Sequence, residues 1–196
     1  MELGVITAVI VGFSLAAGNS HARGALPAKE PRLESMLLTV KQMPTGWNVD
    51  NSPGSGFGCL HNALEPPGVK LTASAAVAFQ DQGALPQVTE KLATYATAAR
   101  QAFATIVGTL DRCKRLSGSS GGQKVTGTVG QMSFPGYGDQ SAAFVASFTI
   151  SGLTADEDVL IARKGSVLIG ISEGAVGSPD LTQFQGFVRL ALARVH

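Results

Sequence analysis

The sequence predicts an α+β fold, in which an antiparallel sheet is covered by two main amphipathic helices within a single domain that carries one disulfide. Apolar residues take alternate positions in residues 71–80, a period typical of a half-buried strand. They recur every three or four residues over 85–113 and again after Pro179, which is typical of amphipathic helices. Several short apolar runs between these segments predict strands in series, and this combination favours an α+β architecture.

Residues 1–22 are predicted to be a signal peptide or an N-terminal anchor. The apolar segment Leu3–Ala17 is followed by Ser20-His21-Ala22, which fits a small-x-small cleavage site. The early charge is Glu2, whereas a signal peptide normally opens with Lys or Arg, and the apolar run is shorter than the about 20 residues of a spanning helix. We expect an exported protein, extracellular or in the cell envelope. Membrane contact would come only from an uncleaved N-terminus. The third interpretation of the apolar segment is a buried helix.

Residues 23–34 contain glycine, prolines and mixed charges, so we expect a flexible tether. The sensor-like α+β domain is predicted to cover 35–196, a length that allows one substantial core. A short helical stretch from Ser35 leads to the turn Pro44-Thr45-Gly46, which delivers Trp47 into a strand.

A long helix is predicted from Leu85 to Cys113, because its apolar residues fall on one helical face for about eight turns. Those residues are Leu85, Val88, Leu92, Tyr95, Ala99, Ala102, Ile106, Leu110 and Cys113. Thr97 falls on the opposite face. Cys113 is in phase with the apolar stripe, so we expect its sulfur to point inward.

The second half of the chain is predicted to form a loop, several strands and a helix. Residues 117–122 are rich in Ser and Gly and are predicted to form a flexible surface loop. The predicted strands are Lys124–Phe134, Ala142–Ser151 and Val159–Ile171, the last with a hairpin turn at Lys164-Gly165-Ser166. Pro179 and Asp180 open the final helix.

The chain has two cysteines, Cys59 and Cys113. In an exported protein an even cysteine count is interpreted as disulfides, and two cysteines allow one pairing. Closing a loop of about 55 residues is worth roughly 4 kcal/mol on the chain-entropy model. The disulfide is therefore expected to contribute a large part of the stability of the domain.

Composition argues against several classes of function. The net charge is +1 and charged residues make up 15% of the chain, without a concentrated basic face, so no nucleic-acid partner is expected. His61 is isolated in sequence, and Asp156-Glu157-Asp158 lacks the spacing of a calcium loop, so we interpret the triplet as a solvated turn. Gly54–Gly58 is not followed by the Lys of a phosphate loop. No metal and no cofactor are predicted.

Gly170-Ile171-Ser172-Glu173-Gly174 matches the G-x-S-x-G pattern of a nucleophile elbow. An elbow requires a helix to begin immediately after it, and here a Gly- and Pro-containing segment intervenes. The histidine downstream is His196, the last residue. We therefore predict a protein that is not an enzyme and has no catalytic residues, with a serine hydrolase using Ser172 as the alternative.

Four residues are the candidate ligand contacts: Trp47, Tyr137, Asp139 and Arg163. The two aromatic side chains can line a pocket and the two charged ones can orient polar groups, as in concave sites with a few polar groups. In the alternative interpretation Trp47 fills the core and Asp139 caps a turn.

Several of these motifs occur together in one order: Met43–Trp47, Cys59, a helix ending in Cys113, Gly138–Ala142 and the hairpin Val159–Leu168. In this the chain resembles actinobacterial envelope proteins related to the extracellular sensor domain of PknH-type mycobacterial Ser/Thr kinases. The resemblance implies an exported α+β domain with a cleft for an unknown small molecule, lipid, glycan or envelope protein.

The chain departs from that family in two respects. The kinase sensor carries two disulfides where one is possible here, and no kinase segment is present, so signalling would need a separate partner. A weaker likeness, in fold type alone, is to PsbP-like mycobacterial lipoproteins, but Asn19 stands where a lipid-bearing cysteine would be.

Overall fold

The computed structural model describes residues 33–51, 58–82, 85–120, 123–150 and 152–196. The predicted signal peptide or anchor, most of the tether and most of the glycine-rich segment Gly54–Gly58 lie outside these residues. The strands are β1 (Asn48–Val49), β2 (Ala73–Gln80), β3 (Gln87–Thr94), β4 (Arg115–Ser120), β5 (Gln123–Gln131), β6 (Gln140–Ile150), β7 (Leu153–Lys164) and β8 (Val167–Val176). The α-helices are α1 (Ala99–Arg112) and α2 (Leu181–Arg194), and the 3-10 helices are η1 (Leu33–Met36), η2 (Val40–Gln42) and η3 (Gly58–Leu60).

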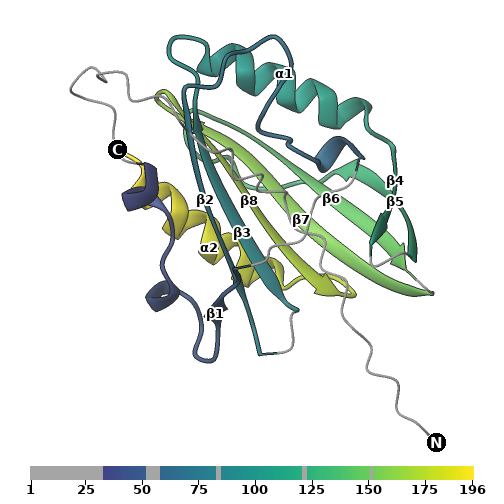
Figure 1. The fold of residues 1–196 in the computed structure, drawn as a ribbon. Helices are drawn as coiled ribbons and strands as arrows, with labels where there is room; N and C mark the ends of the chain where they lie inside the picture. The colour runs from purple at the N-terminus through teal and green to yellow at the C-terminus, as the bar shows by residue number, and fades with distance from the viewer. Residues whose placement is uncertain (1–32, 52–57, 83–84, 121–122, 151) are drawn as a thin grey trace, which may run out of the picture.

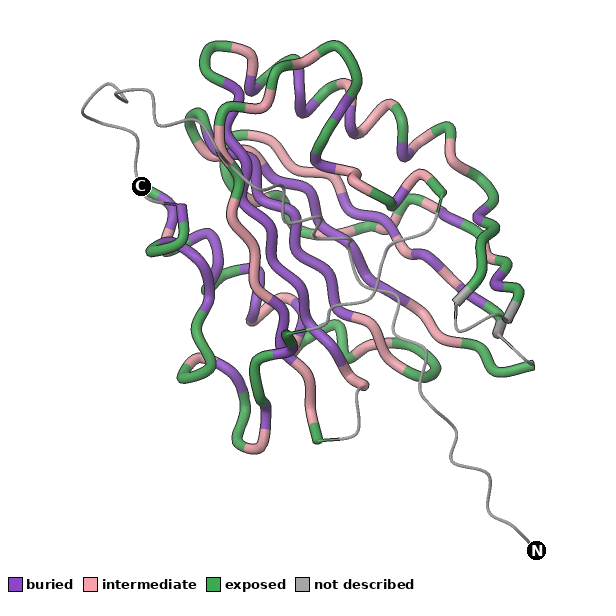
Figure 2. Tube along the Cα trace, viewed as in Figure 1, coloured by how far each residue is buried: buried purple, intermediate pink, exposed green. Residues whose placement is uncertain are grey.

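All eight strands form one antiparallel sheet in the order β1-β2-β3-β8-β7-β6-β5-β4. Helix α1 carries the chain from β3 to the far edge of the sheet, and the following meander returns strand by strand until β8 pairs with β3. Figure 1 shows the long central strands with α1 and α2 on opposite sides of the sheet. Because both faces are covered there, the middle strands are buried along most of their length (Figure 2).

One core lies between the sheet and α1. Ala102, Phe103, Ile106 and Leu110 of the helix belong to the same buried cluster as Phe144 and other residues of β5–β8. The segment after η3 joins this layer, where the Tyr95 hydroxyl donates to the Leu64 carbonyl and Lys91 pairs with Glu65 at 2.7 Å.

The Cys59–Cys113 disulfide connects η3 to the residue that ends α1, with the two Cα atoms 6.2 Å apart. The predicted pairing is therefore confirmed. The bond therefore fixes the segment that follows the first strand to the C-terminal end of α1.

The second core lies between the sheet and α2. Phe184, Phe187, Val188 and Ala191 of the helix pack with apolar residues of β3, β7 and β8 and with η1. Asp180 caps the helix by accepting hydrogen bonds from the N–H groups of Thr182 and Gln183 at 2.8 and 3.1 Å. The predicted start of this helix is confirmed.

The long helix predicted from Leu85 to Cys113 is wrong over its first half, where the chain forms β3 and then turns at Ala96, which has a φ of 51°. All eight residues of β3 are buried. Val88 and Leu92 face α2 while Ala93 faces α1, and polar Glu90 stands between the two large apolar residues on the α2 face, so the alternation of apolar and polar residues is interrupted. A spacing of four residues fits one face of a strand as well as one face of a helix.

Two further segments differ from expectation. Residues 115–120, most of which we expected in a loop, form the edge strand β4, because backbone pairing with β5 orders a Ser- and Gly-rich segment in which Leu116 is buried. The acidic triplet 156–158 is not a solvated turn but part of β7, with Glu157 and Asp158 buried. The turn between β7 and β8 lies where it was predicted, and η1 begins at Leu33, two residues before the predicted start of the domain.

Candidate functional site

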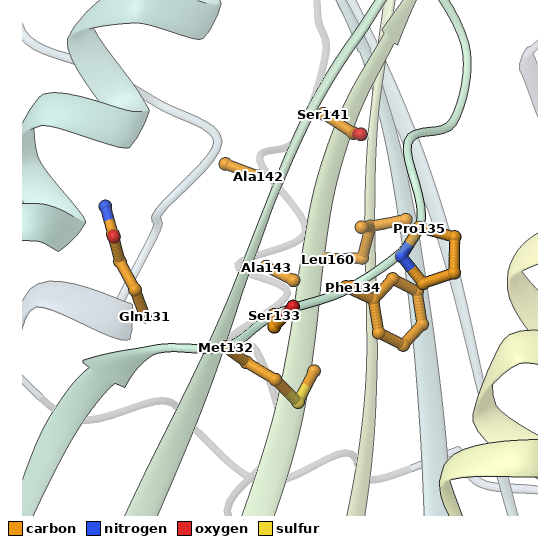
Figure 3. Close-up of a pocket in the computed structure, with 9 residues that line it drawn as sticks. All are labelled: Gln131, Met132, Ser133, Phe134, Pro135, Ser141, Ala142, Ala143 and Leu160. Carbon is orange, nitrogen blue, oxygen red and sulfur yellow. The ribbon is translucent and has the colours of Figure 1, made fainter.

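A groove of about 290 Å³ opens on the α2 side of the sheet, between the β5–β6 connection and strands β6 and β7. Figure 3 shows the connection passing over the strands, with the side chains that line the groove. Six of its nine lining residues have apolar side chains, and three bear uncharged polar groups. The lining residues are Gln131, Met132, Ser133, Phe134, Pro135, Ser141, Ala142, Ala143 and Leu160.

The groove exists because the connection is held at both ends and arches between them. At one end the Met132 N–H donates to the Ala143 carbonyl at 2.9 Å, and at the other the Asp139 N–H donates to the Arg163 carbonyl at 2.8 Å. In between, the Phe134 ring packs against Phe184 of α2 with ring centroids 5.4 Å apart. The helix thus supports the inner wall of the groove.

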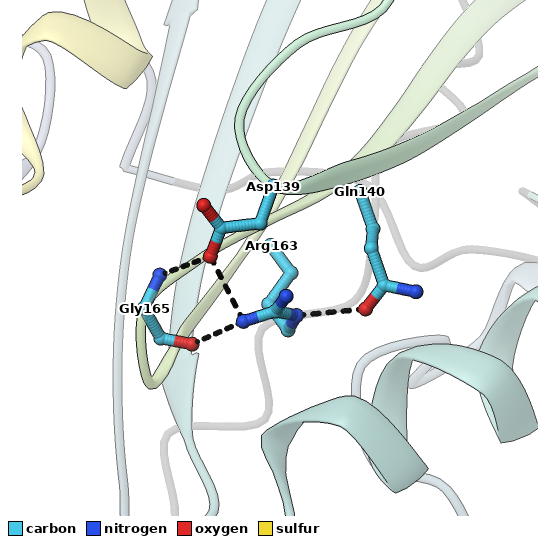
Figure 4. A network of polar contacts seen from close by, with 4 residues as sticks. All are labelled: Asp139, Gln140, Arg163 and Gly165. Atoms are coloured by element: carbon cyan, nitrogen blue, oxygen red, sulfur yellow. Dashed lines mark hydrogen bonds and ion pairs between the residues drawn. The ribbon is translucent and has the colours of Figure 1, made fainter.

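Asp139 and Arg163 join the far end of the connection to the β7–β8 turn (Figure 4). The Arg163 Nη1 lies 2.9 Å from Asp139 Oδ2 and donates to the Gly165 carbonyl at 2.8 Å, while its Nε donates to Gln140 Oε1 at 2.8 Å. Asp139 Oδ2 also accepts from the Gly165 N–H at 2.9 Å. These two charged groups therefore bind each other and the turn.

Gly138 makes this close approach possible. Its φ is +64°, and a Cβ at this position would lie 2.5 Å from the Arg163 carbonyl oxygen. A residue with a side chain would be both strained and in collision with backbone there.

The structure brings three of the four predicted ligand contacts together at the far end of the β5–β6 connection, and none of the four is among the residues that line the groove. Tyr137 packs against Phe134 with centroids 5.8 Å apart, and it stands two residues before Asp139, which binds Arg163. Trp47 lies elsewhere on the α2 side, buried against Phe187 at 5.7 Å. Its position fits the alternative interpretation, in which it fills the core. A ligand role for the four residues stays a prediction.

Sequence reasoning missed the residues that line the groove, above all Met132, Phe134, Ala143 and Leu160. One signal for them was present: two aromatic residues occur within the short segment Phe134-Pro135-Gly136-Tyr137-Gly138, which reads as a loop. An aromatic side chain in a connection must find a surface to cover. Which strand it covers depends on the path of the connection, and that path cannot be predicted from the neighbouring residues in the sequence.

Sequence reasoning also missed a set of buried carboxyl groups. Asp158 and Glu173 stand directly opposite each other on β7 and β8 and face α2, and their residues are 6% and 1% exposed. Burial, together with the charges of Asp158 and Asp180, raises the pKa of Glu173 to about 8. Burial and the charge of Asp156 raise the pKa of Asp158 to about 6. Glu173 Oε2 has no hydrogen-bond partner within the described part of the chain.

Glu157 is buried on the opposite face of the sheet, beside Ser172. Burial raises its pKa to about 8, opposed by a hydrogen bond with Ser172. Ser172 itself lies inside β8, 2% exposed, and α2 begins at Leu181. The G-x-S-x-G match is thus extended strand and not a strand–helix turn.

Within the described ranges, no group of three or more His, Cys, Asp or Glu residues is arranged to hold a metal ion. In the same residues no helix is both long and apolar enough to cross a membrane.

Comparison with known proteins finds a likeness of fold. The structure superposes on the crystal structure of the extracellular domain of PknH from Mycobacterium tuberculosis with a TM-score of 0.60 and 13% sequence identity, covering 87% of this chain and 96% of that one. No family model matches the sequence. No curated protein matches it either. The resemblance expected from the motifs is therefore confirmed as a resemblance of fold.

Proposed function

We propose that residues 35–196 form one non-catalytic, sensor-like ligand-binding domain of an exported protein, and that the groove beside Phe134 takes a neutral small molecule with both apolar and hydrogen-bonding groups. The composition of the groove carries this proposal. None of its nine lining residues is charged, and Ser133, Ser141 and Gln131 can offer hydrogen bonds at its edges. A volume of about 290 Å³ suits a small ligand, or one end of a longer one.

Two observations support the exported location. Residues 3–17 are apolar and are followed by a small-x-small motif that fits a cleavage site, and the two cysteines are joined, as in proteins of oxidising compartments. One structure with a similar fold is the extracellular domain of PknH from Mycobacterium tuberculosis. By analogy of fold, a sensor-like role is favoured over a purely structural one.

The position of Ser172 supports a non-catalytic role. A nucleophile must reach the substrate, and this side chain is buried inside a strand. A fluorophosphonate probe should leave the native protein unlabelled. Labelling at Ser172 would favour the hydrolase alternative instead.

Binding can be tested with Nile red, a neutral apolar dye whose fluorescence rises in apolar sites. Ala143→Leu should fill the groove and weaken dye binding by about tenfold or more, because the added side chain takes up space that the ligand needs. Ser147→Leu is the matched control: it lies on the same face of β6, outside the groove, and should bind as the wild type does. Equal affinity in all three proteins would place the dye elsewhere and contradict the proposal.

Tyr137 and Arg163 give a second set of variants. Tyr137→Ala should weaken dye binding, since Tyr137 supports the Phe134 wall. Arg163→Ala should weaken it through the far end of the connection, and we also expect a lower melting temperature because the ion pair and two hydrogen bonds are lost. Normal binding by both variants would show that this end of the connection does not shape the site.

A further inference from the structure

The segment that joins residues 1–32 to the domain is packed against the α2 side of the sheet. Leu33, Met36, Leu37 and Leu38 are all buried in the cluster that includes α2. In Figure 1 this segment lies beside the C-terminal end of α2. Any chain that precedes the domain is therefore connected to it through this packed segment.

Charged side chains from β3 and α2 hold the backbone of the segment. Glu90 Oε2 accepts a hydrogen bond from the Leu38 N–H at 2.6 Å. Arg194 donates from Nε to the Met36 carbonyl at 3.1 Å and from Nη2 to the Ser35 carbonyl at 2.8 Å.

Glu90 stands in an apolar setting that the segment helps to create. It is 0% exposed, and its strand neighbours on the same face are Val77 and Ile171. Its Oε1 has no hydrogen-bond partner among the described residues. Ionising a carboxyl group in such an apolar place costs free energy.

The charged groups on the elements around Glu90 are few. β2 carries none, and β8 contributes Glu173, opposite Val88 of β3. On α2, Arg194 favours the ionised form, while Arg189 is exposed, and Glu34 on η1 is exposed as well. One cation thus opposes the burial of Glu90.

Burial dominates this balance and raises the pKa of Glu90 to about 7, although the Leu38 N–H and Arg194 both lower it. If the segment leaves the sheet, water reaches the carboxyl group and its pKa returns toward the ordinary value of 4.5. The docked form then binds a proton more tightly than the undocked form, and by linkage protonation favours docking.

We propose that residues 33–38 form a proton-linked latch, which Glu90 tightens onto the sheet in mild acid and loosens at alkaline pH. The latch couples the pH outside the cell to how firmly the domain grips the chain that precedes it. The inference is independent of the groove and of the ligand proposed above.

Hydrogen–deuterium exchange of the wild-type protein at pH 5.5 and pH 8.5 tests the latch, with rates corrected for intrinsic pH dependence. The protection of residues 33–38, divided by that of α1, should fall by roughly tenfold, and by at most about thirtyfold if the pKa moves fully between 7 and 4.5. Division by α1 removes the effect of global unfolding.

Glu90→Gln removes the titration while keeping the size of the side chain, so the ratio should become the same at both pH values. Glu157→Gln is the matched control, because it removes a buried carboxyl group with a raised pKa from the opposite face and should keep the wild-type pH response. Glu90→Leu, also uncharged, serves if the glutamine variant does not fold. A ratio that does not change with pH in the wild type, or a pH response that survives in the Glu90 variant, would overturn the proposal.

Discussion

Asp158 and Glu173 face each other across the paired strands β7 and β8, and both are buried on the side of the sheet on which α2 packs. Because both carboxyl groups are buried and stand on neighbouring strands, ionising both of them costs free energy. Proteins place such groups at functional sites and also in structural networks, so their pH dependence is worth measuring.

We expect the domain to be most stable in mild acid. The pKa values of Glu173, Glu157 and Glu90 are raised to about 8, 8 and 7 from the ordinary 4.5, so the folded state binds more protons than the unfolded state across this range. Stability present below pH 4.5 is then lost progressively as the pH rises to about 8. Urea unfolding at pH 5, 7 and 8.5 should show a falling free energy of unfolding.

Glu173→Gln should reduce this decline, by about 1.4 kcal/mol for each unit of pKa difference that it removes. Glu34→Gln, at an exposed position on η1, is the control and should keep the wild-type slope. Stability that rises between pH 5 and 8.5 would contradict the prediction.

Gly138→Ala should destabilise the protein by about 1–3 kcal/mol, because the new Cβ would meet the Arg163 carbonyl and the backbone has a positive φ. Gly136→Ala, two residues earlier in the same connection, meets nothing within 4 Å and should change stability little. Thermal unfolding of the two variants measures the difference. Equal melting temperatures would show that the connection does not need its observed path.

Cys59→Ser and Cys113→Ser should be about equally destabilising, by roughly 4 kcal/mol, because each opens the same loop of 54 residues. The double variant should cost hardly more than either single one, since the bond can be lost only once. Denaturant titration gives the free energies. If non-reducing mass spectrometry finds two free thiols in exported material, the Cys59–Cys113 disulfide is not formed and the prediction is wrong.

Leu92→Ala and Ile106→Ala should each cost about 2–5 kcal/mol, as buried large-to-small changes do. The two residues belong to different cores, on opposite faces of the sheet, so their effects should add in the double variant. Thr97→Ala, at an exposed position between β3 and α1, should be nearly neutral. A large effect at Thr97, or strong coupling between Leu92 and Ile106, would contradict this division of the core.

Much of the fold was accessible from sequence where local pattern and tertiary setting agree. The β7–β8 hairpin follows from its turn residues Lys164-Gly165-Ser166, and α2 follows from its cap at Asp180 and its apolar spacing. β3 was missed because polar Glu90 stands between Val88 and Leu92 on one face of the strand, so the alternation is interrupted, and its buried polar residues find partners only in three dimensions.

By itself the sequence determined the α+β class, the pairing of its two cysteines and the position of the turn between β7 and β8. Tertiary structure alone decided that the acidic triplet lies in a strand with Glu157 and Asp158 buried, that Ser172 is inaccessible and that a groove opens beside Phe134. These outcomes depend on which segments cover each face of the sheet. The burial and the pKa of a residue are set by the neighbours that the fold brings to it, and those neighbours lie far away in sequence.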